Sequence, residues 1–436
     1  MSCEEKYISI EEALSKVKNG DVIVTGLGAA EAGLFMGSLH TIADRVRGVK
    51  VTNCLPTHPS EIYKPEYADS FEVDGWFYAP PMRKAHAQGN MSYIPNHLHL
   101  AATKWLYRHK PNIFVAAASM PDKDGNISLS TSNTYELRML EAADLVILEV
   151  NPNFPFTSGD LIVPVEKVDY LISADYPVPV IPDAPSSDKD RVIGRAIAEL
   201  VPDGACIQLG IGGIPNAVAE FLKEKNDLGV HTEMITSKMV ELMKLGVITN
   251  KYKQMDAGKM VATFALGNQA VYEFLDHNPS VELRDGAWVN DPYVIARNNN
   301  QISINTSLEV DLTGQCASES IGSRQFSGTG GQSDTAIGAQ MSKNGRSVIA
   351  LYSTATVKGP DGERREVSKI VPQLQSGAAV SLSRNDVDLV ITEYGVADLR
   401  GASIRERVRE LIQIAHPKFR DSLWDQAVEA GILGRR

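Results

Sequence analysis

Short, continuous apolar runs alternate with longer amphipathic segments along the chain. The apolar runs, five to seven residues long, are rich in β-branched residues, as is typical of strands buried on both faces of a sheet. Segments such as Ile214–Lys225 and Ile404–Ala415 repeat their apolar residues at helical spacing. The pattern therefore predicts an α/β fold with mainly parallel sheets. The expected strands are Asp21–Thr25, Val49–Asn53, Asn112–Ala117, Asp144–Val150, Ala205–Leu209, Met260–Phe264, Ser347–Tyr352 and Asp388–Glu393.

Two stretches of the first half of the chain recur in the second half in the same order. Asn19–Gly28 resembles Asp203–Gly212, and the three glycines of each stretch align at a constant offset of 184 residues. Ala143–Glu149 resembles Val387–Glu393 at an offset of 244. Chance resemblance between strand–turn–helix units could explain either echo alone, but two echoes in order favour two related open α/β domains.

The boundary between these domains is expected in the segment Tyr176–Ser187. Its four prolines, Pro177, Pro179, Pro182 and Pro185, cannot continue a helix or a central strand. We interpret the segment as an extended linker between a domain of residues 1–183 and a domain of residues 184–436. A ligand site is expected between the two domains.

Composition narrows the possible partners and the compartment. The 436 residues include 43 Lys and Arg against 54 Asp and Glu, a net charge of −11, which argues against a general binder of nucleic acid or anionic membranes. The four cysteines form no C-x-x-C pair and fit reduced thiols. The N-terminus is polar without a secretory signal, and the apolar runs are too short to span a membrane. We expect a soluble, cytoplasmic protein.

Two glycine-rich segments are candidate anion sites. The first, Gly210-Ile211-Gly212-Gly213-Ile214, follows an expected strand and opens an expected helix, where backbone amides can bind an anion or an oxyanion. Pro215 at the third small position disfavours a dinucleotide fingerprint, and no Gly-Lys-Ser/Thr follows as in a P-loop. A tight structural turn fits the same spacing equally well. The second, Ser327–Asp334 with Gly328, Gly330 and Gly331, fits close approach of a ligand or a flexible surface loop, and its composition slightly favours the loop.

Chemistry-bearing side chains are less distinctive. The nine histidines show no H-E-x-x-H spacing, so no metal site is expected. No G-x-S-x-G elbow is present, which weakens a serine-hydrolase mechanism. Spacing does not single out Glu233 from the other acids. Glu393 ends an apolar run, at the carboxyl edge of an expected parallel strand, where ligands bind in open α/β sheets. These features alone indicate an α/β enzyme with anion-binding turns.

Several ordered motifs resemble those of the acetyl-CoA hydrolase/transferase family of CoA-transferases. The motifs are Gly210–Val218, Val230–Met234, Ser327–Gln332, Ile391–Gly401 and Ala415–Arg420, and the resemblance covers nearly the whole chain. One motif departs from close relatives of the family. After His-Thr-Glu-Met, they usually continue with Ser/Thr-Asp-Gly, whereas this chain has Ile235-Thr236-Ser237-Lys238. This change of charge beside the glutamate affects the expected choice of substrate more than the expected reaction type.

The resemblance implies covalent carboxylate chemistry with Glu233, in the C-terminal domain, as the nucleophile. Its carboxylate would attack an acyl-CoA to give a mixed anhydride, and the released thiolate would then form a glutamyl-CoA thioester. Asn290 would position groups near the thioester, and Glu393 would be an auxiliary carboxylate that holds Glu233 or a carboxylate substrate. The implied CoA- and oxyanion-binding residues are Gly210, Ile211, Gly212, Gly213, Ile214, Gly328, Gly330 and Gly331.

The implied function is transfer of CoA between a short-chain acyl-CoA, such as 4-hydroxybutyryl- or butyryl-CoA, and a carboxylate such as acetate. Coenzyme A would be substrate and covalent intermediate, with no ATP, metal or tightly bound cofactor, and the family resemblance implies a homodimer. An acyl-CoA hydrolase on the same scaffold is the alternative, since water exclusion depends on closure of the site. A non-catalytic CoA-binding protein is a third possibility.

Overall fold

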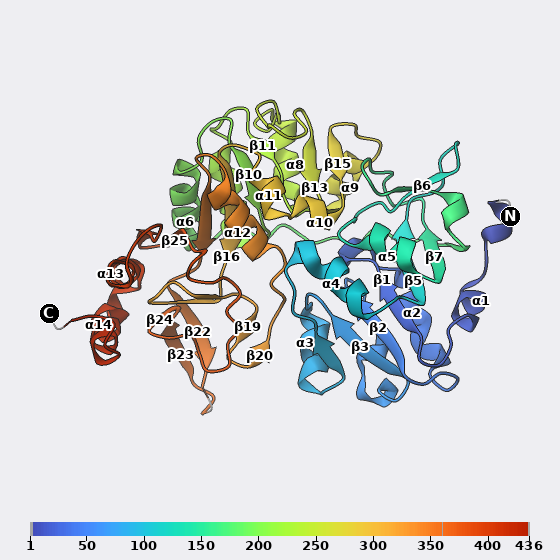
Figure 1. Cartoon of the computed structure of the whole chain (residues 1–436), viewed down its shortest axis with the longest axis horizontal. Helices are drawn as coiled ribbons and strands as arrows, with labels where there is room; N and C mark the ends of the chain where they lie inside the picture. The colour runs from blue at the N-terminus through green and yellow to red at the C-terminus, as the bar shows by residue number, and fades with distance from the viewer. Residues whose placement is uncertain (1–2, 360, 435–436) are drawn as a thin grey trace. The chain divides into compact units, whose positions relative to one another are not determined.

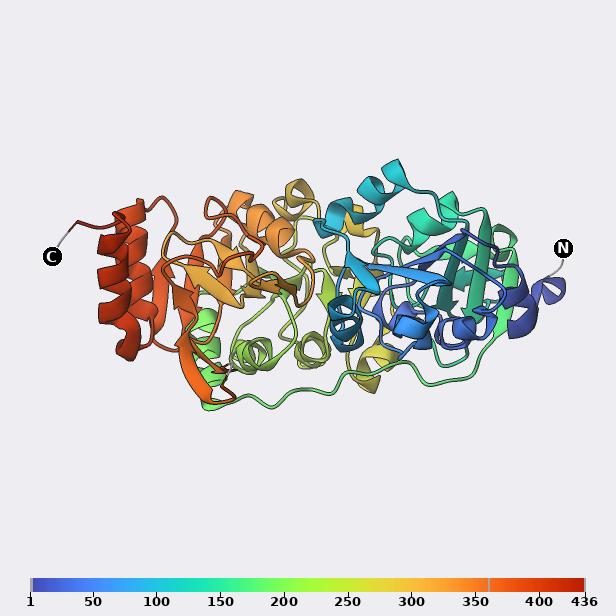
Figure 2. The same cartoon turned by 90° about the horizontal axis from the view of Figure 1, so that it is seen from below.

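The computed structural model describes residues 3–359 and 361–434, which form two compact units. Unit 1 contains Met1–Pro182, His231–Val240 and Gly258–Asp291. Unit 2 contains Asp183–Val230, Glu241–Ala257 and Pro292–Arg436. The first boundary lies in the proline-rich segment, which carries neither helix nor strand and runs as an extended chain (Figure 2). The units are not two consecutive halves, because two segments from beyond residue 183, including Glu233 and Asn290, are part of unit 1.

Unit 1 is built on a seven-stranded parallel sheet of order β4-β3-β2-β1-β5-β7-β9 (Figure 1). The strands are β1 (Val22–Thr25), β2 (Val49–Asn53), β3 (Phe71–Gly75), β4 (Met91–Tyr93), β5 (Ile113–Ala118), β7 (Leu145–Val150) and β9 (Tyr170–Ser173). The four expected strands of this part of the chain correspond to β1, β2, β5 and β7. β5 is buried at every position, as expected for a strand covered on both faces.

The helices of unit 1 are short. They are α1 (Ile10–Ser15), α2 (Gly33–Ser38), α3 (Pro80–Ala87), α4 (Ala101–Arg108), α5 (Glu136–Ala142), α9 (Gln269–Leu275) and α10 (Gly286–Val289). A further helix, α8 (Ser237–Lys244), begins in unit 1 and ends in unit 2. An antiparallel ladder joins β6 (Asn126–Ser128) to β8 (Ile162–Pro164).

The expectation of one strand over Met260–Phe264 is wrong. The segment is divided into β13 (Met260–Ala262) and β14 (Phe264–Ala265), which belong to different two-stranded ladders. β13 pairs with β15 (Val281–Leu283), and β14 pairs with β12 (Met234–Ile235). The break occurs because the N–H groups of Thr263 and Phe264 both donate to the Glu233 carbonyl oxygen, at 3.0 and 3.1 Å. The division of this strand therefore anchors the backbone of Glu233.

Unit 2 is built on a six-stranded sheet of order β11-β10-β16-β21-β25-β26, parallel except for its last pair. The strands are β10 (Cys206–Leu209), β11 (Gly229–Val230), β16 (Gln301–Thr306), β21 (Arg346–Ala350), β25 (Leu389–Thr392) and β26 (Gly395–Asp398). The expected strands near residues 205, 347 and 388 correspond to β10, β21 and β25. Together the two sheets establish a mixed α/β fold with mainly parallel sheets.

The main helices of unit 2 are α6 (Asp188–Glu199), α7 (Gly213–Leu222), α11 (Pro292–Ile295), α12 (Gln332–Met341), α13 (Ile404–Ile414) and α14 (Arg420–Glu429). Figure 2 shows α13 and α14 lying side by side near the C-terminus. The smaller strands are β17 (Glu309–Asp311), β18 (Cys316–Ala317), β19 (Ser320–Ile321), β20 (Arg324–Gln325), β22 (Thr354–Lys358), β23 (Arg364–Ser368) and β24 (Ile370–Val371).

The strand order gives each sheet a point where the chain reverses its direction of travel across the sheet. The reversal lies between β1 and β5 in unit 1 and between β10 and β16 in unit 2. The echo at offset 184 therefore joins equivalent strands, β1 and β10, each followed by a glycine turn at a place where open α/β sheets bind ligands. The echo at offset 244 does not, because β7 is the second strand from β1 whereas β25 is the third from β10.

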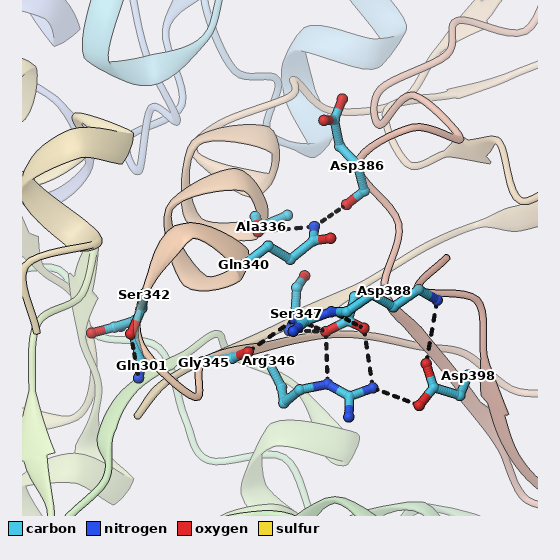
Figure 3. Close-up of polar contacts among 11 residues, drawn as sticks. Gln301, Ala336, Gln340, Ser342, Gly345, Arg346, Ser347, Asp386, Asp388 and Asp398 are labelled. Carbon is cyan, nitrogen blue, oxygen red and sulfur yellow. Dashed lines mark hydrogen bonds and ion pairs between the residues drawn. The ribbon is translucent and has the colours of Figure 1, made fainter. Parts of the chain in front are cut away.

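At the amino ends of β21 and β25, unit 2 is fastened by an ion-pair network around Asp388 (Figure 3). The Asp388 carboxylate is fully buried and accepts four N–H bonds of 2.7–3.0 Å from the guanidinium groups of Arg346 and Arg400. The Ser347 N–H donates a fifth bond at 2.9 Å. Arg346 also donates to the exposed Asp398 at 2.9 Å. Each carboxylate of the network is paired with a guanidinium group. Because Arg346 and Ser347 belong to β21 and Asp388 directly precedes β25, these bonds join the two strands.

No helix within the described residues is long and apolar enough to cross a membrane.

Candidate active site

Glu233 lies in unit 1, in the short connection between β11 and β12, and its side chain is half-buried. Its backbone is held by the two hydrogen bonds from Thr263 and Phe264. The neighbouring His231 is buried, and its Nε2 lies 2.7 Å from the carbonyl oxygen of Val289 in α10. Glu233 is therefore on a backbone fixed on both sides, which suits a group that must hold one geometry.

Asn290 is one side chain that the structure brings to Glu233. It follows α10 directly, is almost completely buried, and its Nδ2 donates to Glu233 Oε2 at 3.2 Å. The Oδ1 atom of Asn290 is buried and accepts no hydrogen bond from the residues that the structure describes. Since 57 positions separate the two residues, only the tertiary fold makes this pair.

The position of Asn290 follows from tight packing of α10. Gly286, the first residue of the helix, lies so close to Thr134 that an added Cβ would be 2.5 Å from the Thr134 carbonyl oxygen. Asp285 caps the helix by accepting the Ala287 N–H at 3.0 Å and forms an ion pair with Arg138. The helix that presents Asn290 is thus fixed at its first residue.

The sequence analysis did not single out Cys54, although this residue lies at the carboxyl edge of the unit 1 sheet. It directly follows β2 and is buried. Burial raises the pKa of its thiol well above the ordinary value, and the carboxylates of Glu136 and Glu233 raise it further. The thiol is therefore neutral at physiological pH and is a poor nucleophile. Its place after an expected strand was the signal that could have found it.

The glycine turn lies in unit 2, between β10 and α7. Gly212 adopts φ +115° and caps the helix, a conformation that L side chains rarely adopt. The first amides of α7 have no acceptor inside the helix, so they can bind an anion at the positive end of the helix dipole. The structure thus has the strand–turn–helix context that the sequence predicted for residues 210–214.

The second glycine segment is a loop that hydrogen-bonds with Glu319. The Glu319 carbonyl oxygen accepts the N–H groups of Phe326 and Ser327, and its carboxylate accepts the Thr329 hydroxyl. Gly328 is buried, and Gly330 adopts φ +55° just before Gly331, the N-cap of α12. Glu319 thus contacts the loop through both its backbone and its side chain.

A buried polar network connects the two glycine segments within unit 2. Gln208, the penultimate residue of β10, accepts hydrogen bonds from the Ser303 hydroxyl and the Ile304 N–H, both at 3.1 Å. Asn305 donates to Ser303 at 2.9 Å and to the Thr335 hydroxyl, in the first turn of α12, at 3.0 Å. These polar side chains give no spacing signal, and sequence reasoning missed them.

Glu393 directly follows β25 at the carboxyl edge of the unit 2 sheet. Its carboxylate accepts the N–H and the hydroxyl of Ser353, both at 2.8 Å, and pairs with Lys189 at 2.9 Å. Burial alone would raise its pKa, but the Lys189 ammonium and the Ser353 donors outweigh burial and hold the pKa of Glu393 below its ordinary value. Glu393 is consequently an anion at neutral pH.

The structure thus assembles the candidate residues in two groups. Unit 1 holds Glu233 with Asn290, and unit 2 holds Glu393, the glycine turn and the glycine loop. Lys238, the departure beside the nucleophile, is the second residue of α8 in unit 1. Among the described residues, no three His, Cys, Asp or Glu side chains gather in a way that could hold a metal ion.

Family models match two parts of the chain, and the second part includes Asn290, the glycine loop and Glu393, whereas Glu233 and the glycine turn lie between the two matched ranges. The model described as "Acetyl-CoA hydrolase/transferase N-terminal domain" matches residues 2–182, and that of the C-terminal domain matches residues 267–427. The chain belongs to the acetyl-CoA hydrolase/transferase family. The family resemblance inferred from the motifs is confirmed.

Individual relatives cover nearly the whole chain. A 4-hydroxybutyrate coenzyme A transferase of Clostridium kluyveri is 41% identical over 97% of this chain and 97% of its own length. A butyryl-CoA:acetate CoA-transferase of Anaerostipes caccae is 33% identical over 99% of this chain and 98% of its own. Relatives named as hydrolases are more distant, for example the acetyl-CoA hydrolase of Candida glabrata, which is 28% identical over 79% of this chain and 72% of its own.

The fold agrees with a solved structure. The crystal structure of RipA from Yersinia pestis is similar with a TM-score of 0.90 and 33% identity, covering 99% of this chain and 100% of that chain.

Proposed function

We propose that this protein is a CoA-transferase that moves CoA between a short-chain acyl-CoA and a carboxylate. Butyryl- and 4-hydroxybutyryl-CoA are the proposed donors and acetate is the proposed acceptor, because relatives at 33–41% identity carry these names. The observation that carries the mechanism is the Glu233 carboxylate held by Asn290, since a fixed carboxylate can act as a nucleophile without a metal or ATP.

In the proposed first half-reaction, a Glu233 oxygen attacks the thioester carbonyl carbon. The C–S bond breaks, CoA leaves as its thiolate, and an acyl-glutamyl anhydride forms. The thiolate then attacks the glutamyl carbonyl, the acyl carboxylate leaves, and a glutamyl-CoA thioester remains. A second carboxylate reverses these steps and leaves as the new thioester. Thioester energy is conserved throughout, so no other energy source is needed.

Each addition creates an oxyanion that needs hydrogen-bond donors. We propose that the amides of residues 210–214 and of Gly331 supply them, because both segments lie at the N-termini of long helices. Gly328 and Gly330 would let the CoA chain approach the backbone closely. Asn290 would orient Glu233, and Glu393 would be the auxiliary carboxylate. A homodimer in the cytoplasm completes the proposal and is checked by light scattering and by cell fractionation.

The acetate dependence of the products distinguishes the transferase from the hydrolase. With butyryl-CoA and acetate, the proposed function predicts acetyl-CoA and butyrate in equal amounts and no net loss of thioester. Glu233→Ala should abolish both products, whereas Lys110→Ala, on the surface of unit 1, should match the wild type. Release of free CoA at a rate independent of acetate would instead establish a hydrolase. CoA binding without turnover would establish a binding protein.

A further inference from the structure

Five residues of unit 2 form a closed ring at the carboxyl edge of its sheet, linked by three side-chain contacts and by two pairs of chain neighbours. Two members, Lys189 and Asp190, are neighbours in the first turn of α6, and two more, Tyr352 and Ser353, are neighbours just after β21. Asp190 accepts the Tyr352 hydroxyl at 2.6 Å, Ser353 donates to Glu393 at 2.8 Å, and Glu393 pairs with Lys189 at 2.9 Å. Figure 1 shows the α6 helix beside β25, which Glu393 follows.

The glycine turn lies against this ring. A Cβ added at Gly213, the first residue of α7, would lie 2.6 Å from Asp190 Oδ2 and 2.9 Å from Oδ1. Asp190 is 2% exposed, and its Oδ2 accepts the N–H and the hydroxyl of Ser187 at 2.8 and 2.7 Å. Asp190 therefore caps α6 with one oxygen and holds Tyr352 with the other, while both oxygens border the turn.

The hydrogen bond from Tyr352 to Asp190 is not needed to cap α6, because the capping contacts with Ser187 use the other oxygen of Asp190. Burial and the Asp190 carboxylate raise the pKa of Tyr352 to about 12, so its phenol stays protonated and donates its hydrogen bond to Asp190 at every physiological pH. Its backbone continues directly into Ser353, both of whose donors bind Glu393. A shift of Tyr352 would thus move the Asp190 carboxylate under the glycine turn and the Glu393 carboxylate together.

We propose that Tyr352, through its hydrogen bond to Asp190, is a positioning residue that fixes the Gly210–Gly213 turn and Glu393 in one geometry. The proposal rests on the proposed function, in which these two groups serve the same reaction. Preorganised donors act only when they are aimed at the developing charge before it forms, and small displacements weaken them strongly. The ring provides that preorganisation within unit 2.

Tyr352→Phe tests the proposal, because it removes only the hydroxyl. We expect kcat for butyryl-CoA:acetate transfer to fall about tenfold, with KM for butyryl-CoA changed less than about twofold, because Tyr352 positions donors rather than substrate. Tyr107→Phe is the matched control, since Tyr107 is 94% exposed in unit 1, and it should match the wild type. Thermal midpoints of both variants are measured in parallel.

Gly213→Ala attacks the same contact from the other side. The new Cβ would displace the Asp190 carboxylate from Tyr352, so kcat should again fall about tenfold. The double variant Gly213→Ala/Tyr352→Phe should lower kcat little more than either single change, because both changes disrupt the same contact between Asp190 and Tyr352. The same lack of additivity is expected between Tyr352→Phe and Glu393→Gln.

The outcomes separate the two proposals. If wild-type protein forms no acetyl-CoA and no glutamyl adduct, the proposed function fails. If wild type is active and folded Tyr352→Phe has wild-type kcat, the positioning proposal alone is overturned. Fully additive losses in both double variants would also overturn it, since Tyr352 would then act independently of the turn and of Glu393.

Discussion

Asp388 and Glu393 flank the same strand, β25, only five positions apart, yet the two carboxylates are held in different ways. Asp388, before the strand, is fully buried and receives five hydrogen bonds from two arginines and a backbone amide. Glu393, after the strand, is 8% exposed, and its cation Lys189 is about half exposed. The carboxylate at the amino end of the strand is therefore surrounded by protein donors. The carboxylate at the carboxyl end is paired with an ammonium group that is in contact with solvent.

This difference indicates that the two ends of one strand have different roles, with stability served at the amino end and function at the carboxyl end. Removing one partner of a buried ion pair strongly destabilises a protein, so a fully paired buried charge is suited to a structural role. A carboxylate at the ligand-binding edge, with a half-exposed ammonium, can respond to a substrate. The following predictions test this division from the largest expected effect to the smallest.

Asp388→Asn should cause the largest loss of stability. The amide leaves Arg346 and Arg400 without their shared carboxylate, and we expect the free energy of unfolding to fall by about 3 kcal/mol. Because both guanidiniums are partly exposed, water recovers some of the loss, which places the effect at the lower end for a broken buried pair. Urea unfolding measures it. A large fall in kcat of the folded fraction would contradict a purely structural role.

Glu393→Gln should show the opposite profile. The change keeps the size of the side chain but removes the charge, so kcat for transfer should fall about a hundredfold. The free energy of unfolding should change by less than about 1 kcal/mol. Steady-state kinetics and urea unfolding on one preparation give both numbers. A stable variant with wild-type kcat would remove Glu393 from the mechanism.

Lys189→Met should move the pH dependence. The Lys189 ammonium helps to hold the pKa of Glu393 below its ordinary value, so its removal should raise that pKa and shift the acid limb of kcat/KM to higher pH. The depressed pKa stabilises the fold above the unfolded carboxyl pKa, and this contribution disappears as pH falls through the folded pKa. Lys110→Met, which breaks an exposed pair with Asp144 in unit 1, is the control. Superimposable pH profiles would contradict the proposed coupling.

Asp398→Asn should have the smallest effect. Asp398 belongs to the Asp388 network but is 57% exposed, and an exposed ion pair contributes little. We expect the free energy of unfolding to change by less than about 0.5 kcal/mol and kcat to remain at the wild-type value. A loss as large as that of Asp388→Asn would show that burial does not explain the strength of the network.

The sequence predicted the sheet strands that are mostly apolar, and it missed those that are short or carry more polar residues, which are β3, β4, β9, β11, β16 and β26. β2 has the expected bounds, and β1, β5, β10 and β25 differ from expectation by a residue or so at their ends. β16, central in the unit 2 sheet, was missed because Gln301, Ser303 and Asn305 alternate with apolar residues. The Ser303 and Asn305 side chains hydrogen-bond with Gln208 and Thr335 in the interior, an arrangement that no local pattern reports.

The candidate site was predictable in its parts and not in its assembly. The glycine turn and the place of Glu393 followed from the strand–turn–helix pattern. Glu233 and Asn290 came only from family motifs, since their contact spans 57 positions and depends on a broken strand and a tightly packed four-residue helix. The ring through Tyr352 joins segments 162 positions apart and has no sequence signal.

The mass of the intact protein after mixing with acetyl-CoA, without an acceptor acid, tests the central claim most directly. The account predicts a CoA-sized adduct that maps to Glu233, is absent from Glu233→Ala, and disappears when a carboxylate is added. Rapid release of CoA with no trapped adduct and no response to acetate would contradict the account, because Glu233 would then not carry CoA between two acids.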